Sequence, residues 1–275
     1  MTAGPCDSDR FAVLRRWRRI WAVASIHGEA DQLGRILDGI AQRHEPGDRI
    51  VFLGNYLGYG PDVGGTLDRL IEFRRRFLAL PATFLDDIVF LRGWQEEMWH
   101  KLLQLQMAAD PRNVLRWMLE HGAAATLAAY GYEPRHAEGA TREGVMAMTR
   151  WTSGLRAAID ARPGHRSFFN AVKHAARTDD DKLLFVHAGY DAGKPLELQG
   201  DILWWGGAEG SGGEILQRAE PFPGVGRIVR GFDRQHAGVR RGPYALSLDG
   251  GAGFGGKLIA VCFDADGTAI ETLSA

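Results

Sequence analysis

The sequence predicts an α/β fold with α+β character, and three features support this. Residues 20–24, Ile-Trp-Ala-Val-Ala, form an apolar run with the length of a short buried strand. Apolar residues then recur with helical spacing over residues 30–43, and a second apolar run ends at Leu53. Glycine-rich turns separate several short apolar runs in the last third, as in sheets built from short loops.

The first half of the chain is expected to contain a β-α-β unit. Leu33, Ile36, Leu37 and Ile40 fall at i, i+3, i+4 and i+7, which predicts an amphipathic helix between the two strands. The run ending at Leu53 is continuously apolar and enters a loop at once, as a buried parallel strand does. In open α/β sheets ligands bind at such strand ends, so this loop is the first candidate site.

The remaining elements are predicted in order along the chain. A helix is expected over residues 64–78, a strand over 87–91, an interrupted helical excursion from 96 to about 176, and strands over 182–189, 227–229, 244–248 and 258–263, the last three antiparallel-like. No repeat, low-complexity tract or linker is visible. We therefore expect a single domain over residues 1–275 with a helical insertion at about 96–178.

Composition limits the function classes. The chain has 275 residues, 45% of them hydrophobic, and a net charge of −1, which indicates a large core and no overall attraction for nucleic acid. No signal peptide or membrane span is apparent, and Cys6 and Cys262 give neither a disulfide framework nor a zinc spacing, so a cytoplasmic protein is expected. Arginines at 15–19 and 74–76 are interpreted as solvated flanks, with an anion-binding patch as the alternative.

Several loops resemble motifs of the calcineurin-like metallophosphoesterases, in particular the branch of bacterial serine/threonine phosphatases and diadenosine-tetraphosphate hydrolases. The resemblance spans about residues 21–266. Its motifs are Ser25-Ile26-His27-Gly28, the Gly54–Asp62 loop, Leu91-Arg92-Gly93-Trp94-Gln95-Glu96-Glu97-Met98, residues 125–131, Phe185-Val186-His187-Ala188-Gly189 and Leu248-Asp249-Gly250-Gly251-Ala252-Gly253.

This resemblance implies a four-layer αββα sandwich, in which two mixed β-sheets are flanked by helices. It also implies a centre of two divalent metal ions, of Mn, Fe or Zn, at the strand ends, where the ions would activate a water molecule and hold a phosphoryl group. The metal positions of the family correspond here to Ser25, His27, Asn55, Trp94, His187 and Phe232.

Only His27 and His187 match the family at these six positions, and no carboxylate remains among them. Divalent ions need oxygen anions or several imidazoles, and a bridging carboxylate offsets the repulsion between two cations. Asn55 offers a neutral carbonyl oxygen, whereas Trp94 and Phe232 offer no ligand atom and more volume. We therefore expect no metal, and rings where metal and substrate would lie.

The positions that would assist catalysis are altered too. Gln95 replaces a histidine that would protonate the leaving group, Gly58 replaces the aspartate that would orient it, and Tyr59 replaces a phosphate-binding arginine. Arg92 matches the family and keeps a fork suited to phosphate or carboxylate. Relatives often read Trp-Ile-Arg where residues 204–207 read Trp-Trp-Gly-Gly.

Three functional hypotheses stay open. The favoured one is a pseudophosphatase without catalytic residues, which binds a protein partner or a phosphorylated ligand through Arg92, Asn55, His27 and His187. The second is a metal-dependent serine/threonine phosphatase or nucleotide phosphohydrolase with a rearranged site built from His27, Asn55 and His187, in which Asp233 or Asp249 would offer a replacement carboxylate. The third is a structural subunit, for example a homodimer. Its contact face would be an aromatic set, otherwise interpreted as core, consisting of Trp94, Trp99, Trp204, Trp205 and Phe232.

Overall fold

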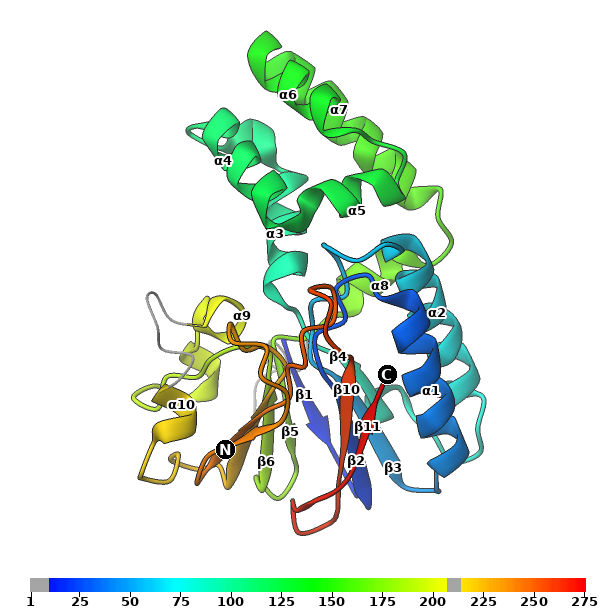
Figure 1. Ribbon diagram of the computed structural model, residues 1–275, viewed down its shortest axis with the longest axis vertical. Helices are drawn as coiled ribbons and strands as arrows, with labels where there is room; N and C mark the ends of the chain where they lie inside the picture. Colours follow the sequence, from blue (N-terminus) through cyan, green and yellow to red (C-terminus); the bar gives the residue numbers. More distant parts are fainter. Residues whose placement is uncertain (1–9, 207–213) are drawn as a thin grey trace.

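Two mixed β-sheets lie face to face with helices on both outer sides, as the resemblance implies (Figure 1). The computed structural model describes residues 10–206 and 214–275; the polar N-terminal tail with Cys6, and Gly207, lie outside these ranges. The five-stranded sheet has the order β11(Ala269–Ser274), β10(Ile259–Phe263), β2(Arg19–Val23), β3(Asp48–Phe52) and β4(Ile88–Phe90). The six-stranded sheet has the order β1(Phe11–Leu14), β5(Ala175–Thr178), β6(Leu183–Val186), β7(Arg227–Arg230), β9(Ala245–Ser247) and β8(Arg240–Arg241).

Alternation of side chains along the strands produces the layers. In β3, Val51 faces the other sheet and joins the core between the sheets, whereas Phe52 faces the core beneath the helices. A third core cluster lies on the far side of the six-stranded sheet, where Leu184 and Ile228 contact Trp204 of α9(Ile202–Trp205). The order helix, sheet, sheet, helix is the predicted αββα sandwich.

The predicted β-α-β unit is confirmed. β2, β3 and β4 run parallel, so their carboxyl ends meet at one edge of the sheet. α1(Ala30–Arg43) and α2(Val63–Leu78) cover the outer face, and the Asp62 side chain caps α2 by accepting from the Gly65 N–H at 2.7 Å.

The insertion is helical, as predicted, up to residue 171. Its helices lie beyond the ends of the strands and extend the molecule along its longest axis (Figure 1). They are α3(Trp94–Leu102), α4(Pro111–Met118), α5(Ala124–Ala129), α6(Pro134–Glu143), α7(Val145–Asp160) and α8(His165–Ala171). No helix in the described part of the chain is long and apolar enough to cross a membrane.

Two predictions about strands are wrong. The stretch predicted as helical to about residue 176 contains β5, which pairs parallel with β1 and antiparallel with β6. The strands of the last third are not all antiparallel, because β7 runs parallel to both β6 and β9. α10(Glu214–Gln217) lies between β6 and β7, so the connection there is a crossover rather than a hairpin.

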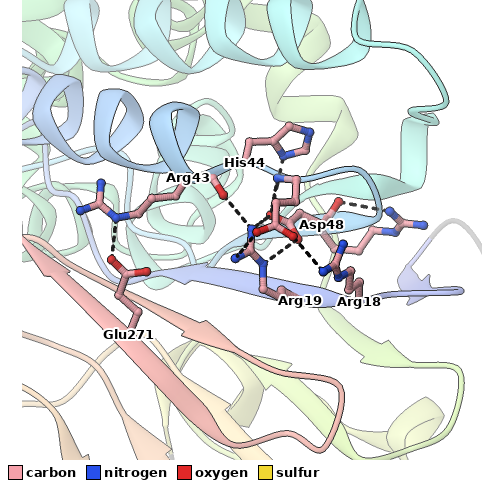
Figure 2. Close-up of polar contacts among 8 residues, drawn as sticks. Arg18, Arg19, Arg43, His44, Asp48 and Glu271 are labelled. Carbon is pink, nitrogen blue, oxygen red and sulfur yellow. Dashed lines mark hydrogen bonds and ion pairs between the residues drawn. The ribbon is translucent and has the colours of Figure 1, made fainter.

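The first arginine cluster is only partly a solvated flank. Figure 2 shows Arg19 reaching the carboxylate of Asp48, which accepts from Arg19 Nε at 3.0 Å and from Nη2 at 2.7 Å. The Asp48 side chain is fully buried, and Glu45 pairs with both Arg19 and the exposed Arg18. These ion pairs fasten the start of β3 to the start of β2.

Candidate functional site

The residues at the metal positions lie on loops with unusual backbone conformations. His27, Asn55 and Tyr59 have φ angles of 52°, 55° and 50°, in the left-handed region that non-glycine residues adopt at a cost. Gly54 precedes Asn55 with a φ of 97°. The loops that carry the predicted site residues therefore have a strained backbone.

Close approach of two loops explains the matching glycines. A Cβ at Gly54 would lie 2.7 Å from the Gly93 nitrogen and 2.8 Å from His187 Nδ1. A Cβ at Gly93 would lie 2.4 Å from the Asn55 nitrogen. Larger residues would push apart the loops after β3 and β4, so both glycines serve the frame.

A buried carboxylate holds these loops together. Glu96 accepts hydrogen bonds from the N–H groups of Gly93 at 2.9 Å, Asn55 at 2.8 Å, Tyr56 at 2.9 Å and Leu57 at 3.3 Å. Burial raises the pKa of Glu96, and the four N–H donors oppose that shift. Glu96 thus fixes the geometry of the Asn55 loop without facing the metal positions.

The Asn55 amide is fully occupied by protein partners. Its Oδ1 accepts from the Gln95 N–H at 3.1 Å, which fixes the orientation of the amide. Its Nδ2 lies 3.2 Å from His27 Nε2 and 3.5 Å from Ser25 Oγ, and Ser25 Oγ donates to the Gly231 carbonyl at 2.8 Å. Asn55 therefore turns its nitrogen, and no oxygen, toward two of the metal positions.

Both retained histidines are buried and neutral. Burial lowers the pKa of His27 to about 3 and the pKa of His187 to about 4. His27 Nε2 accepts from Asn55, and the backbone of Leu57 lies near enough to favour the protonated ring slightly. His187 Nδ1 donates to the Leu53 carbonyl at 2.6 Å, and its Nε2 is buried without a partner.

The side chain of Gln95 packs directly against the backbone of Gly58. A Cβ at Gly58 would lie 2.5 Å from Gln95 Oε1, so the Gln95 amide takes the space of a side chain at residue 58. Gln95 Nε2 donates to the His121 carbonyl at 2.8 Å. An amide held in this way cannot deliver a proton near neutral pH.

Aromatic rings cover the buried polar groups; Tyr59, Trp94, Phe232 and Phe254 are called the aromatic cap below. Phe232 stacks on His187 with centroids 5.5 Å apart, and Trp94 packs on Phe232 at 5.7 Å. Tyr59 and Phe254 both contact the His27 ring edge-on, at 5.4 and 5.1 Å. The four rings are partly exposed, whereas Ser25, His27, Asn55, Gln95 and His187 are at most 1% exposed.

The two proposed replacement carboxylates are engaged elsewhere. Asp233 Oδ2 pairs with Arg230 and Arg240, each at 3.0 Å. Asp249 Oδ2 accepts from the Asp233 N–H at 2.9 Å and lies 2.9 Å from His236 Nδ1, which raises the pKa of His236. Both carboxylates shape the loops after β7 and β9.

The donor set does not fit a two-metal centre. Neither indole nor phenyl rings coordinate divalent ions, and Asn55 and Ser25 already use their polar atoms. Over residues 10–206 and 214–275, no group of three or more His, Cys, Asp or Glu side chains is arranged to hold a metal ion. No catalytic step through a metal is therefore derived for this chain.

The structure separates Arg92 from the other predicted ligand-binding residues. Asn55, His27 and His187 meet under the aromatic cap, whereas Arg92 donates to Glu97 at 2.9 Å and lies 5.9 Å from the Trp204 ring centroid. Phe254 was not predicted as a site residue, because the glycine-rich loop at residues 250–256 was interpreted as a turn. The sequence feature that could have indicated its role is that Phe254 is the one aromatic residue in this loop.

No family model and no curated protein matches the sequence. Among solved structures, a candidate diadenosine tetraphosphatase superposes with a TM-score of 0.59 at 17% identity, covering 97% of this chain and 98% of that one. A point mutant of a cold-active protein tyrosine phosphatase superposes with a TM-score of 0.50 at 13% identity, over 99% and 86%. The sandwich thus shares the fold of these solved structures, and its loops carry the motifs that resemble calcineurin-like metallophosphoesterases.

Proposed function

We propose that this protein is a pseudophosphatase, a phosphoesterase-fold protein that binds a partner protein or a phosphorylated ligand without hydrolysing phosphate esters. The observation that carries the proposal is the hydrogen bonding of Asn55. Its oxygen is bonded to the backbone of Gln95 and its nitrogen points at His27, where a catalytic centre would need a bridging carboxylate.

The aromatic cap supports the same proposal. Phe232 and Trp94 lie over His187, and Tyr59 and Phe254 lie over His27, so a phosphoryl group would have to displace several packed rings to reach either imidazole. The retained frame then serves as a stable surface, as expected of a binding or regulatory protein.

Hydrolysis of 4-nitrophenyl phosphate with and without Mn²⁺ tests this proposal, together with the metal content of the purified protein. We expect the wild type to match the His187→Ala variant at background rate in both conditions. Turnover that needs Mn²⁺ and disappears in His187→Ala would overturn the proposal in favour of a rearranged metal-dependent phosphatase. A stoichiometric transition metal that resists dialysis would do the same.

A further inference from the structure

A cavity of about 470 Å³ lies away from the aromatic cap, where the insertion meets the sandwich. Its walls come from α3, α7, α8 and the loop before α3. In Figure 1 these helices meet above the ends of the strands. The volume is in the range of small-molecule sites.

Three arginines line this cavity, with Glu96 as the only acidic lining residue, and Glu96 is already satisfied by backbone N–H groups. Arg156 donates to the Leu103 carbonyl, and within the described ranges it pairs with no carboxylate. Arg166 is half-exposed and forms an ion pair with Asp160, in which its Nη2 lies 2.6 Å from Asp160 Oδ2. Arg92 and Arg166 are thus paired with carboxylates, and Arg156 is the lining arginine whose charge no carboxylate in the described residues offsets.

Arg92 is the third guanidinium of the lining. Its Nη1 donates to Glu97 at 2.9 Å, and its Nε, which has no hydrogen-bond partner among the described residues, is buried and not exposed to the cavity. Burial, with smaller contributions from Arg92 and Arg10, lowers the pKa of His174 to about 4. Arg156 is therefore the guanidinium with which an oxyanion in the cavity would pair.

The rest of the wall is apolar. Trp99, Leu103, Ile159, Phe169 and Val172 line the same cavity as the arginines. Trp99 stacks on Tyr130 with centroids 5.5 Å apart and an interplanar angle of 17°, which fixes the indole in place. A ligand that pairs with the arginines can therefore also bury a flat apolar group against preformed walls.

We infer that this cavity is a binding site for a small oxyanion, a phosphate or carboxylate, carried on a flat apolar group. The cavity is separate from the vestigial metal positions, so it gives the chain a ligand site that does not depend on the loss of catalysis. It also accounts for Arg92, which matches the phosphoesterase motif but lies outside the aromatic cap.

Isothermal titration calorimetry with phenyl phosphate tests the inference. Titrations are done in EDTA, so that metal-dependent turnover at the vestigial centre cannot contribute and the two proposals can fail separately. We expect saturable binding that weakens with added salt, and that falls about tenfold or more in Arg156→Gln. The matched control is Arg150→Gln, an exposed arginine on the same helix outside the cavity lining, which should bind like the wild type.

Further ligands test the arginines and the apolar wall of the site separately. Benzoate tests whether a carboxylate can replace the phosphate, and inorganic phosphate tests the need for the apolar group. The inference requires phenyl phosphate or benzoate to bind at least about tenfold more tightly than inorganic phosphate, with Phe169→Ala reducing that preference. It is overturned if neither aromatic ligand binds, if inorganic phosphate binds equally well, or if Arg150→Gln weakens binding as much as Arg156→Gln.

Discussion

Restoring the missing bridging carboxylate by Asn55→Asp should destabilise the protein rather than restore a metal centre. The side chain is fully buried, and its nitrogen faces His27 Nε2 at 3.2 Å and Ser25 Oγ at 3.5 Å. An aspartate would turn a lone pair toward His27 Nε2, and the neutral ring could donate to it only by moving its proton from Nδ1, next to the Leu57 backbone, to Nε2. The Gln95 N–H would be the one strong donor left to it.

The size of the effect follows from these contacts. Losing the hydrogen bond to His27 costs about 1 kcal/mol, and a buried charge without a partner costs about 3–5 kcal/mol. Protonating His27 would supply a partner, but its pKa of about 3 makes that step cost about 5 kcal/mol at pH 7 before any attraction is counted. We expect the free energy of unfolding to fall by about 3–5 kcal/mol at pH 7.

Urea unfolding at pH 7 and pH 5 measures this loss. The deficit of Asn55→Asp relative to the wild type should shrink at pH 5, because a proton on His27 or on the new carboxyl removes the unpaired charge. The control is Asn113→Asp, the same change at an exposed position in the first turn of α4, where the lost hydrogen bond to Asp110 and the repulsion between the two exposed carboxylates should cost no more than about 1 kcal/mol. An Asn55→Asp variant as stable as the wild type, or one stabilised selectively by Mn²⁺, would refute the reasoning.

Three further predictions concern stability. Glu96→Gln should lower the free energy of unfolding by about 2–4 kcal/mol, because the amide nitrogen of the glutamine would face backbone N–H donors. In the same chemical denaturation experiment, the control Glu72→Gln at an exposed position should lower it by less than about 0.5 kcal/mol. Asp48→Asn should cost about 1–3 kcal/mol, because the guanidinium of Arg19 would keep only the half-exposed Glu45 as a carboxylate partner; an unchanged midpoint would contradict this. The pKa values of His27 and His187 in the folded protein are lowered from about 6.5, so unfolding takes up protons below that pH. The free energy of unfolding should therefore fall by up to about 1.4 kcal/mol per pH unit for each histidine as the pH is lowered to about 4. Urea titrations between pH 7 and pH 5 measure this fall, and a flat profile would contradict the prediction.

One histidine acts in the opposite direction in that pH profile. The Asp249 carboxylate raises the pKa of His236, so this pair stabilises the fold below the unfolded pKa and loses that contribution as the pH rises through the folded value. His236→Gln should therefore steepen the loss of stability toward low pH, whereas His187→Gln should flatten it. Opposite slopes in the two variants separate the contributions.

The strongly patterned elements were predictable from sequence. β3 is buried along its whole length and α1 has a single apolar stripe, so periodicity alone placed them. β11 is an edge strand with alternating partial exposure, and β5 consists of Ala-Ala-Arg-Thr, which carries no strand signal. β5 is a strand because β1, far away in the sequence, pairs with it, and β11 is a strand because it returns antiparallel along the preceding strand β10; the local pattern of neither segment contains its partner.

The motifs predicted which loops carry the candidate residues, but not how the side chains are arranged. The loops of His27 and Asn55 lie side by side because the parallel strands β2 and β3 deliver their loops to one edge. His187 follows β6 in the other sheet and reaches these loops through its hydrogen bond to the Leu53 carbonyl. The closure of the cap by Phe254 depends on a contact with Tyr59 at 4.5 Å between loops almost two hundred residues apart. The turn of Arg92 toward Glu97 likewise depends on how α3 leaves its strand.

The polar groups at the predicted metal positions are paired within the protein. A set of unpaired carboxylates there would bury like charges side by side. Instead, Asn55, Ser25 and the two histidines bond to one another or to the backbone, Glu96 is satisfied by N–H groups, and Asp249, whose charge also acts on both histidines, is paired with His236.

Volume is compensated in the same way as charge. Gln95 extends into the space left by Gly58, and the rings of Trp94 and Phe232 cover His187. Hydrogen bonds and ring packing therefore hold the left-handed loop residues in place. Arg92, two residues before the packed ring of Trp94, lines the cavity beside α3, so the same packing helps to order the site at which we propose that a ligand binds.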